Sequence, residues 1–222
     1  MQIEVKRGNA VMRMTKDKLS LIYKMIIVLV SFIALYLNFK FISVKVGIVY
    51  FTYLSNISCF IYYLVLVIRI LLNKYKENKY HYISKGMVTM ALTLTMVVYN
   101  CVLAEGNLIY LNHELECYLV HLVIPLLVIF DYIIFGKKGN LKREYPFIWS
   151  ITLFIYQIII TIYSFLGGKF IDGADFPYRY MDTALFGNWG VLLNYVLIFV
   201  LFIVYGMLVV AIDNYVGIKS NE

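Results

Sequence analysis

The sequence predicts an all-α membrane protein, a polytopic bundle of six transmembrane helices with both termini in the cytoplasm. Six long apolar stretches take up most of the 222 residues, 62% of the residues are hydrophobic, and only 15% are charged. The Lys and Arg residues stand mostly in the short segments between these stretches. Because the bilayer core offers no water to backbone groups, apolar stretches of about twenty residues form helices there.

The six apolar stretches define the predicted domain organisation. We expect a cytoplasmic N-terminal segment over residues 1–20, a transmembrane domain over 21–211 and a cytoplasmic tail over 212–222. The composition leaves no room for a water-soluble domain. The predicted spans are Leu21–Phe39, Ile48–Leu72, Ile83–Leu103, Tyr118–Phe135, Phe147–Phe165 and Val191–Ala211.

The distribution of positive charge gives the predicted orientation. Fifteen of the twenty Lys and Arg residues lie on the side of the two termini, and four lie on the other side. The remaining one, Lys24, stands in the first turns of the first span, and we expect it to snorkel to the cytoplasmic surface. Loops rich in Lys and Arg stay inside, so the termini are expected in the cytoplasm. The net charge of +7 therefore follows membrane topology and does not indicate a nucleic-acid partner.

The second span opens with a polar stripe. Thr52, Ser55, Asn56 and Cys59 follow one another at helical spacing and share one helix face. Asn is costly in lipid, so this face is expected to turn inward. Two interpretations stay open: the stripe joins helices by hydrogen bonds, or it forms part of a functional site.

The fourth span holds His121, Pro125 and Asp131. Proline lacks an N–H, so the carbonyl of His121 loses its usual donor and the helix is expected to kink. Counted from the outer ends of their spans, His121 and Thr52 both lie roughly 5–6 Å deep, so their side chains can meet. Asp131 lies about 15 Å further along the helix. We expect it to anchor the inner interface or to pair with a nearby Lys.

The third span and the last outer connection add further candidates. Thr89, Thr93 and Asn100 project from one face of the third span, and Asn100 and Glu105 lie near its outer end, where they can join the same cavity. The imidazole of His121 then has Asn100, Glu105 and Tyr50 as candidate partners that orient it.

The connection Leu166–Gly190 combines glycines with aromatic residues and three aspartates, which favours an ordered lid over a slack linker. Its lid residues are Tyr178, Arg179 and Asp182. The last two are interpreted as a surface ion pair, or as a cap above the cavity.

Three motifs stand in the second span, the fourth span and the last outer connection. They are Phe-Thr-x-x-Ser-Asn at Phe51–Asn56, His-x-x-x-Pro with a downstream Asp-Tyr at His121–Tyr132, and Phe-Pro-Tyr-x-Tyr-x-Asp at Phe176–Asp182 followed by Gly187. These motifs resemble those of the bacterial six-helix Pr-six-Pr membrane proteins, which look distantly related to the androgen-induced, FAR-seventeen-a-like family. The resemblance covers the second to the sixth span, and it departs from the family at Arg179, where the bacterial pattern usually has proline.

This resemblance implies a threonine hydrolase of lipid esters. The roles that it carries over are nucleophile for Thr52 and general base for His121. A threonine hydroxyl needs a base within hydrogen-bond reach before it can attack an ester. Ser55, Asn56 and Asn100 are the supporting polar residues, and the two amides are candidates to donate to the oxyanion.

Other functions stay open from the sequence. A small transporter would use His121 and Asp131, and a non-catalytic scaffold or sensor would use the polar stripe for packing alone. We expect membrane lipids as partners, an acyl ester as the substrate if the chain is an enzyme, and neither a cofactor nor a metal. High Ile, Lys, Asn and Tyr usage suggests an AT-rich bacterial genome and hence a bacterial plasma membrane.

Overall fold

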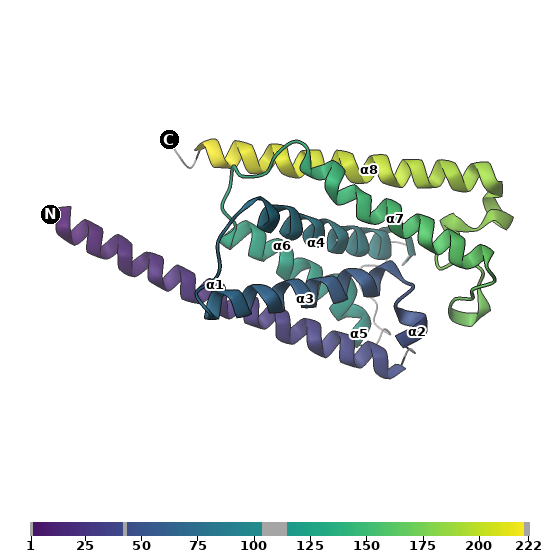
Figure 1. Ribbon diagram of the computed structural model, residues 1–222, viewed down its shortest axis with the longest axis horizontal. Helices are drawn as coiled ribbons and strands as arrows, with labels where there is room; N and C mark the ends of the chain where they lie inside the picture. Colours follow the sequence, from purple (N-terminus) through teal and green to yellow (C-terminus); the bar gives the residue numbers. More distant parts are fainter. Residues whose placement is uncertain (1, 42–43, 104–114, 220–222) are drawn as a thin grey trace.

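Long helices run side by side in this protein, and both termini lie at the same end of the bundle (Figure 1). The computed structural model describes residues 2–41, 44–103 and 115–219. Within these ranges there is no β-strand. The predicted all-α fold is therefore confirmed.

Eight α-helices lie in the described ranges. They are α1 (Gln2–Phe41), α2 (Val44–Gly47), α3 (Phe51–Leu71), α4 (Lys79–Val98), α5 (Leu115–Tyr118), α6 (Ile124–Phe135), α7 (Tyr145–Phe165) and α8 (Thr183–Lys219). Two π-helical segments, η1 (Tyr99–Leu103) and η2 (Leu119–Val123), continue α4 and precede α6. Two short 3-10 turns, η3 (Ile171–Gly173) and η4 (Arg179–Met181), lie between α7 and α8.

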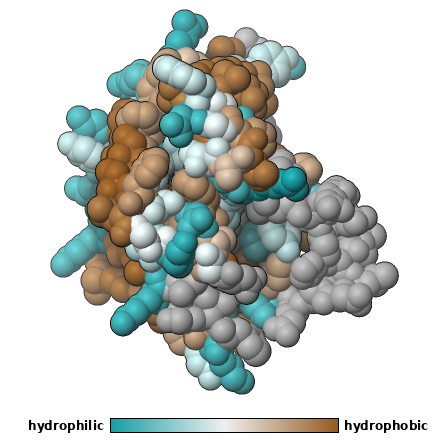
Figure 2. All heavy atoms as spheres, turned by 90° about the vertical axis from the view of Figure 1, so that its right-hand side faces the viewer, coloured by the Kyte–Doolittle hydropathy of each residue, from teal (hydrophilic) through white to brown (hydrophobic). Residues whose placement is uncertain are grey.

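Six helical segments of the described chain are long and apolar enough to cross a membrane. Large hydrophobic side chains are exposed on each of them, fewest on the segment Lys79–Cys101, as is usual where lipid replaces water around a helix. Viewed along the helices from the end opposite the termini, such side chains cover much of the flanks of the bundle (Figure 2). The chain is a multi-pass integral membrane protein, as predicted.

Helix α4 lies at the centre of the bundle. It packs against α3, α6 and α7, whereas α1 packs against α3 and α6, and α8 packs against α7. One core cluster joins α1, α3, α4 and α6 around the fully buried Tyr63 and Leu92. A second joins α4, α7 and α8 around Trp149, whose ring lies so close to Gly86 that a Cβ there would fall 2.2 Å from it. A glycine in α4 thus sets the distance between α4 and α7.

A single carboxylate joins four of the helices at the end that carries the termini. Asp131 of α6 is fully buried and lies 2.8 Å from Lys24 Nζ of α1 and 2.6 Å from Lys85 Nζ of α4. Tyr63 of α3 donates its hydroxyl to the second carboxylate oxygen at 3.0 Å. The expectation that Asp131 pairs with a nearby Lys is confirmed, with two lysines in place of one.

Lys24 does not snorkel, so this prediction was wrong. Its side chain is only 7% exposed, and its ammonium donates to Asp131 and to Ser20 Oγ at 2.6 Å. Lys85 is one of the fifteen basic residues that the sequence placed on the side of the termini. It is likewise buried in α4. A buried carboxylate within reach stabilises both ammonium groups, because charged partners compensate the lost hydration.

The helix ends differ from the predicted spans at both termini of the chain. Helix α1 begins at Gln2 and runs without a break into the predicted span Leu21–Phe39, and α8, from Thr183 to Lys219, extends beyond both ends of Val191–Ala211. A kink at Gly187, with φ of 64°, interrupts α8 near its start. Asp213 stabilises the part of α8 beyond the predicted end. Its buried carboxylate accepts hydrogen bonds from Tyr132 and from the backbone of Asn140 and Leu141.

The connection between α7 and α8 folds back onto the bundle. Phe170 and Met181 are 4% and 0% exposed and pack with Tyr156 and Ile160 of α7. The predicted order of this connection is therefore found in the structure. Asp182 accepts a hydrogen bond from Ala184 N and so caps the start of α8.

We predict that Asp131→Asn lowers the free energy of unfolding by about 3–5 kcal/mol, because it leaves two buried ammonium groups without a counter-charge. Thermal unfolding of the detergent-solubilised protein measures the effect. Glu144→Gln is the matched control: Glu144 lies 3.9 Å from Lys142 with both side chains exposed, and its loss is expected to change stability by less than about 1 kcal/mol. Equal effects of the two substitutions would contradict the anchoring role of Asp131.

We also predict that residue 142 faces the cytoplasm and residue 174 faces outward. Both positions are exposed. In a background carrying Cys101→Ser, a membrane-impermeant maleimide added to intact cells should label Ala174→Cys and leave Lys142→Cys unlabelled. If Lys142→Cys is labelled and Ala174→Cys is not, the orientation derived from the positive charges is wrong.

Candidate functional site

The hydroxyl of Thr52 and the imidazole of His121 face each other near the end of the bundle opposite the termini. Thr52 is the second residue of α3, and His121 lies in the middle of η2. Thr52 Oγ1 and His121 Nε2 are 3.5 Å apart. The second and fourth spans therefore meet at the two side chains that the sequence placed at matching depth.

The backbone holds the ring of His121 in a defined orientation. Its Nδ1 lies 3.0 Å from the carbonyl oxygen of Cys117. A carbonyl only accepts hydrogen bonds, so this contact favours the tautomer that has its proton on Nδ1 and a lone pair on Nε2 toward Thr52. The ring also stacks on Tyr99, with centroids 3.6 Å apart and planes 16° from parallel. The tautomer with its proton on Nδ1 is the one that a general base next to Thr52 requires.

These two contacts were missed by the sequence analysis, which named Asn100, Glu105 and Tyr50 as the residues that orient His121. Glu105 lies outside the described residues. Tyr50 instead accepts a hydrogen bond from Ile171 N and packs against the α7–α8 connection. The spacing of four residues between Cys117 and His121 was the only signal in the sequence, because it brings a carbonyl close to a side chain one helical turn later.

Two π-helical segments frame the site. Tyr99 begins η1 and His121 lies in η2, and short π-helical segments inside α-helices occur frequently at functional sites. Pro125 explains the second one. Residue 125 has no N–H. The carbonyl of His121 therefore lacks the donor of an α-helical hydrogen bond, and the carbonyl of Val120 lacks the donor of a π-helical one.

Two buried amides replace the missing donors. Asn100 Nδ2 donates to His121 O at 3.1 Å, and Asn56 Nδ2 donates to Val120 O at 3.3 Å. Each amide also donates to its own helix, to Met96 O and Thr52 O respectively. Both N–H groups of each amide are engaged, so in this geometry neither amide has a donor left for an oxyanion.

Ser55 of the stripe joins two helices, whereas Thr89 and Thr93 of the third span bind their own helix. Ser55 donates to Thr52 O at 2.9 Å and contacts Thr95 Oγ1 of α4 at 3.0 Å. Thr89 and Thr93 donate to carbonyls of their own helix, α4, so their hydroxyls are occupied there. Ser55 thereby fixes α3 against α4 directly below Thr52.

A small cavity of about 40 Å³ adjoins Thr52. Phe51, Tyr99, Tyr156 and Tyr178 are among its lining residues. This volume holds one water-sized group. Phe51 N–H donates to the hydroxyl oxygens of both Tyr156 and Tyr178, each at 3.1 Å, and Tyr156 in turn donates to Val49 O. Burial raises the pKa of Tyr178, so its phenol stays protonated at neutral pH.

The three predicted lid residues separate in the structure. Tyr178 reaches into the cavity wall, Arg179 is exposed, and Asp182 caps α8. Among the ion pairs of the described residues there is none between Arg179 and Asp182. The predicted surface pair was wrong, because the free backbone N–H groups at the start of α8 bind the carboxylate.

The described part of the chain contains no group of three or more His, Cys, Asp and Glu side chains arranged to hold a metal ion.

No protein-family model, no curated protein sequence and no solved structure matches this chain. The resemblance to the Pr-six-Pr proteins accordingly stands on the motif residues alone. The function is therefore inferred from where these residues lie in the structure.

We predict that Asn100→Ala lowers the free energy of unfolding by about 1–3 kcal/mol, because a buried carbonyl loses its donor. In a Pro125→Ala background the new N–H can bind this carbonyl, so the cost of Asn100→Ala should shrink by at least about 0.5 kcal/mol. Thermal unfolding of the four proteins measures this coupling.

Thr93→Val is the control for this cycle, because its hydroxyl binds only its own helix. Its effect should be equal in the two backgrounds. If Asn100→Ala also costs the same in both backgrounds, the amide does not serve the carbonyl that Pro125 leaves without a donor.

Proposed function

We propose that this integral membrane protein is a hydrolase of lipid esters, with Thr52 as nucleophile and His121 as general base. The observation that carries the proposal is the distance of 3.5 Å between Thr52 Oγ1 and His121 Nε2, in a ring whose Nδ1 lies 3.0 Å from the Cys117 carbonyl oxygen. Such contacts are often long in the free enzyme and shorten when substrate binds. The resemblance of the motifs to an intramembrane threonine hydrolase family supports the same assignment.

The proposed reaction has two steps. His121 Nε2 takes the proton of Thr52 while Oγ1 attacks the acyl carbonyl, and the protonated imidazole then gives that proton to the leaving alcohol. A water molecule activated by the same Nε2 hydrolyses the acyl-threonine and restores the hydroxyl. The bond from Nδ1 to Cys117 O keeps the ring in place throughout, and it stabilises the imidazolium that forms.

We assign the oxyanion donor to Tyr178, in place of Asn56 or Asn100. The Tyr178 hydroxyl lines the cavity beside Thr52 and accepts a hydrogen bond from Phe51 N–H. Its own proton can therefore point to the developing negative charge. The two amides instead support the site by holding the backbone of η2.

The surroundings of Thr52 favour a lipid substrate. Leu94, Val98, Leu153 and Ile198 form apolar walls of the cavity. At about 40 Å³ the cavity is too small for an acyl chain, so the chain has to lie along the apolar flank of the bundle. With the orientation predicted from the positive charges, the ester belongs to the outer leaflet of a bacterial plasma membrane.

One observation favours a second candidate, a non-catalytic scaffold or sensor. Ser55, Asn56 and Asn100 all form hydrogen bonds between helices, which is the usual use of polar residues in membrane bundles. A transporter that uses His121 and Asp131 has less support, because Asp131 is held by two lysines at the other end of the bundle. The two remaining candidates differ in what Thr52 does.

We predict that Thr52→Val abolishes labelling by a fluorophosphonate probe and hydrolysis of a panel of fatty acyl esters, whereas Thr52→Ser retains measurable activity. His121→Gln should lower the rate by about 10²–10⁴-fold, as loss of a general base does. Purified protein in detergent is assayed by fluorescence of the labelled band and by release of fatty acid. Thr152→Val is the control, because the Thr152 hydroxyl binds only the Trp149 carbonyl of its own helix.

Two results would count against catalysis. One is labelling of Thr52→Val at the level of the unaltered protein. The other is the absence of both labelling and hydrolysis, together with lower unfolding temperatures for Thr52→Val and His121→Gln, which is the result that a packing role predicts.

A further inference from the structure

A large cavity lies at the opposite end of the bundle, where both termini lie. Its volume is about 910 Å³, and residues of α1, α3, α4 and α6 line it. This is the size of a ligand pocket, and far larger than the space beside Thr52. We call it the basic cavity, because five lysines line it: Lys16, Lys24, Lys76, Lys85 and Lys137.

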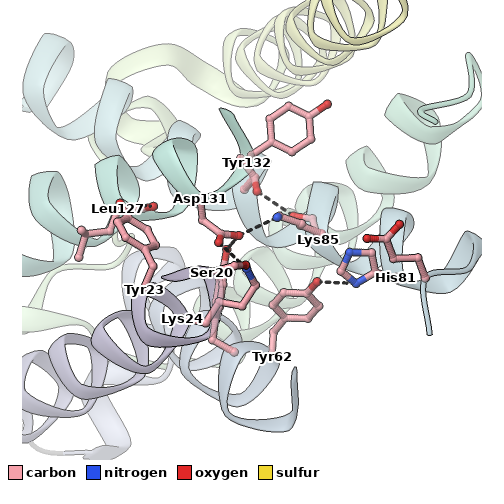
Figure 3. A network of polar contacts seen from close by, with 12 residues as sticks. Ser20, Tyr23, Lys24, Tyr62, His81, Lys85, Leu127, Asp131 and Tyr132 are labelled. Carbon is pink, nitrogen blue, oxygen red and sulfur yellow. Dashed lines mark hydrogen bonds and ion pairs between the residues drawn. The ribbon is translucent and has the colours of Figure 1, made fainter. Parts of the chain in front are cut away.

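The floor of the basic cavity carries an unbalanced charge. Lys24 from α1 and Lys85 from α4 both reach Asp131, as Figure 3 shows. Their side chains are each 7% exposed, and the Asp131 side chain is 0% exposed. Two ammonium groups share one carboxylate, so one positive charge stays buried without a counter-charge. Such a charge is costly, and an anion within reach stabilises it.

The carboxylates on the walls do not supply that counter-charge. Glu77 lies 2.9 Å from Lys137 and accepts a hydrogen bond from Tyr82 at 3.0 Å. Burial alone would raise its pKa, but these two partners lower it overall, so Glu77 is ionised and balances Lys137. Asp17 is an exposed residue beside Lys16 on α1. Lys76 adds a further exposed positive charge.

Hydroxyl groups complete the lining. Ser20 binds Lys24 on the floor, whereas Tyr75 and Tyr82 stand on the wall. The imidazole of His81 is held between Tyr62 and Tyr75, with hydroxyl-to-nitrogen distances of 3.1 and 3.2 Å. The hydroxyls of Tyr75 and Tyr82 donate to Glu77, so the groups of the cavity that attract an added anion are the buried ammonium groups at its floor.

We propose that the basic cavity binds a phosphate group, with Lys24 and Lys85 as its ligands. Lysine binds phosphate as a point charge, and two lysines that share one carboxylate retain attraction for an added anion. Either the headgroup of an anionic phospholipid or free phosphate can bring this chemistry to the cavity. The site is independent of the reaction proposed for Thr52, because it lies at the other end of the bundle and shares no residue with it.

The test measures binding to the full chain in maltoside micelles, which contain no phosphate. One arm titrates inorganic phosphate against chloride at constant ionic strength. The other adds phosphatidylglycerol, with phosphatidylcholine as the comparison. The apparent Kd comes from the rise of the unfolding temperature with ligand concentration.

Lys85→Met is the decisive variant, because it leaves a balanced pair of Lys24 and Asp131. We expect it to weaken the apparent Kd by at least about tenfold, the loss of one charge-assisted contact. Lys142→Met is the matched control, an exposed lysine at the same end outside the cavity, and it should bind as the unaltered protein does. If Lys85→Met does not fold, Lys24→Met leaves the equivalent pair, and Lys76→Met weakens binding from the cavity wall.

The outcomes distinguish a lipid headgroup from free phosphate as the ligand, and they also test the proposal itself. A response to phosphatidylglycerol alone assigns a lipid headgroup, and a response to inorganic phosphate alone assigns a soluble ligand. A response to both assigns a site that accepts either. No response of the unaltered protein in either arm overturns the proposal, and so does equal binding by the unaltered protein and the cavity variants.

Discussion

The carboxylate of Asp131 is the interaction on which the arrangement of the bundle depends. It joins α6 to α1, α3 and α4 through Lys24, Tyr63 and Lys85. In a low-dielectric interior the attraction between the carboxylate and these partners is strong, so it fixes the relative depth of four helices. Asp213 has a comparable role for α8, since it binds the backbone of the α6–α7 connection.

A second constraint comes from the backbone at Pro125. Two carbonyls of η2 lose their donors there, and a buried carbonyl has to be satisfied by another group. Asn56 and Asn100 supply the missing N–H groups from α3 and from η1, which continues α4. As a result, three helices converge on the turn that holds His121. The imidazole is brought to Thr52 by hydrogen bonds that do not involve the ring itself.

The two ends of the molecule therefore differ in chemical character. The end with Thr52 has a small cavity with aromatic and aliphatic walls, which suits an uncharged ester. The end with the termini has a large cavity lined by lysines, which suits an anion. Between them lies a core of apolar side chains in α1, α3, α4 and α6. A membrane protein with this division can contact a lipid tail at one end and a phosphate at the other.

The sequence by itself determined the six helices long and apolar enough to cross a membrane, and the shared depth of Thr52 and His121. These follow from hydropathy and from the constant rise of a helix, which depend on residue spacing alone. Only the tertiary structure decided that Lys24 and Lys85 share one carboxylate, that Asn56 and Asn100 serve freed carbonyls, and that Cys117 O orients His121. Those outcomes depend on how the helices rotate and which neighbours they meet. Packing between residues far apart in the chain sets both, and spacing along one helix does not encode it.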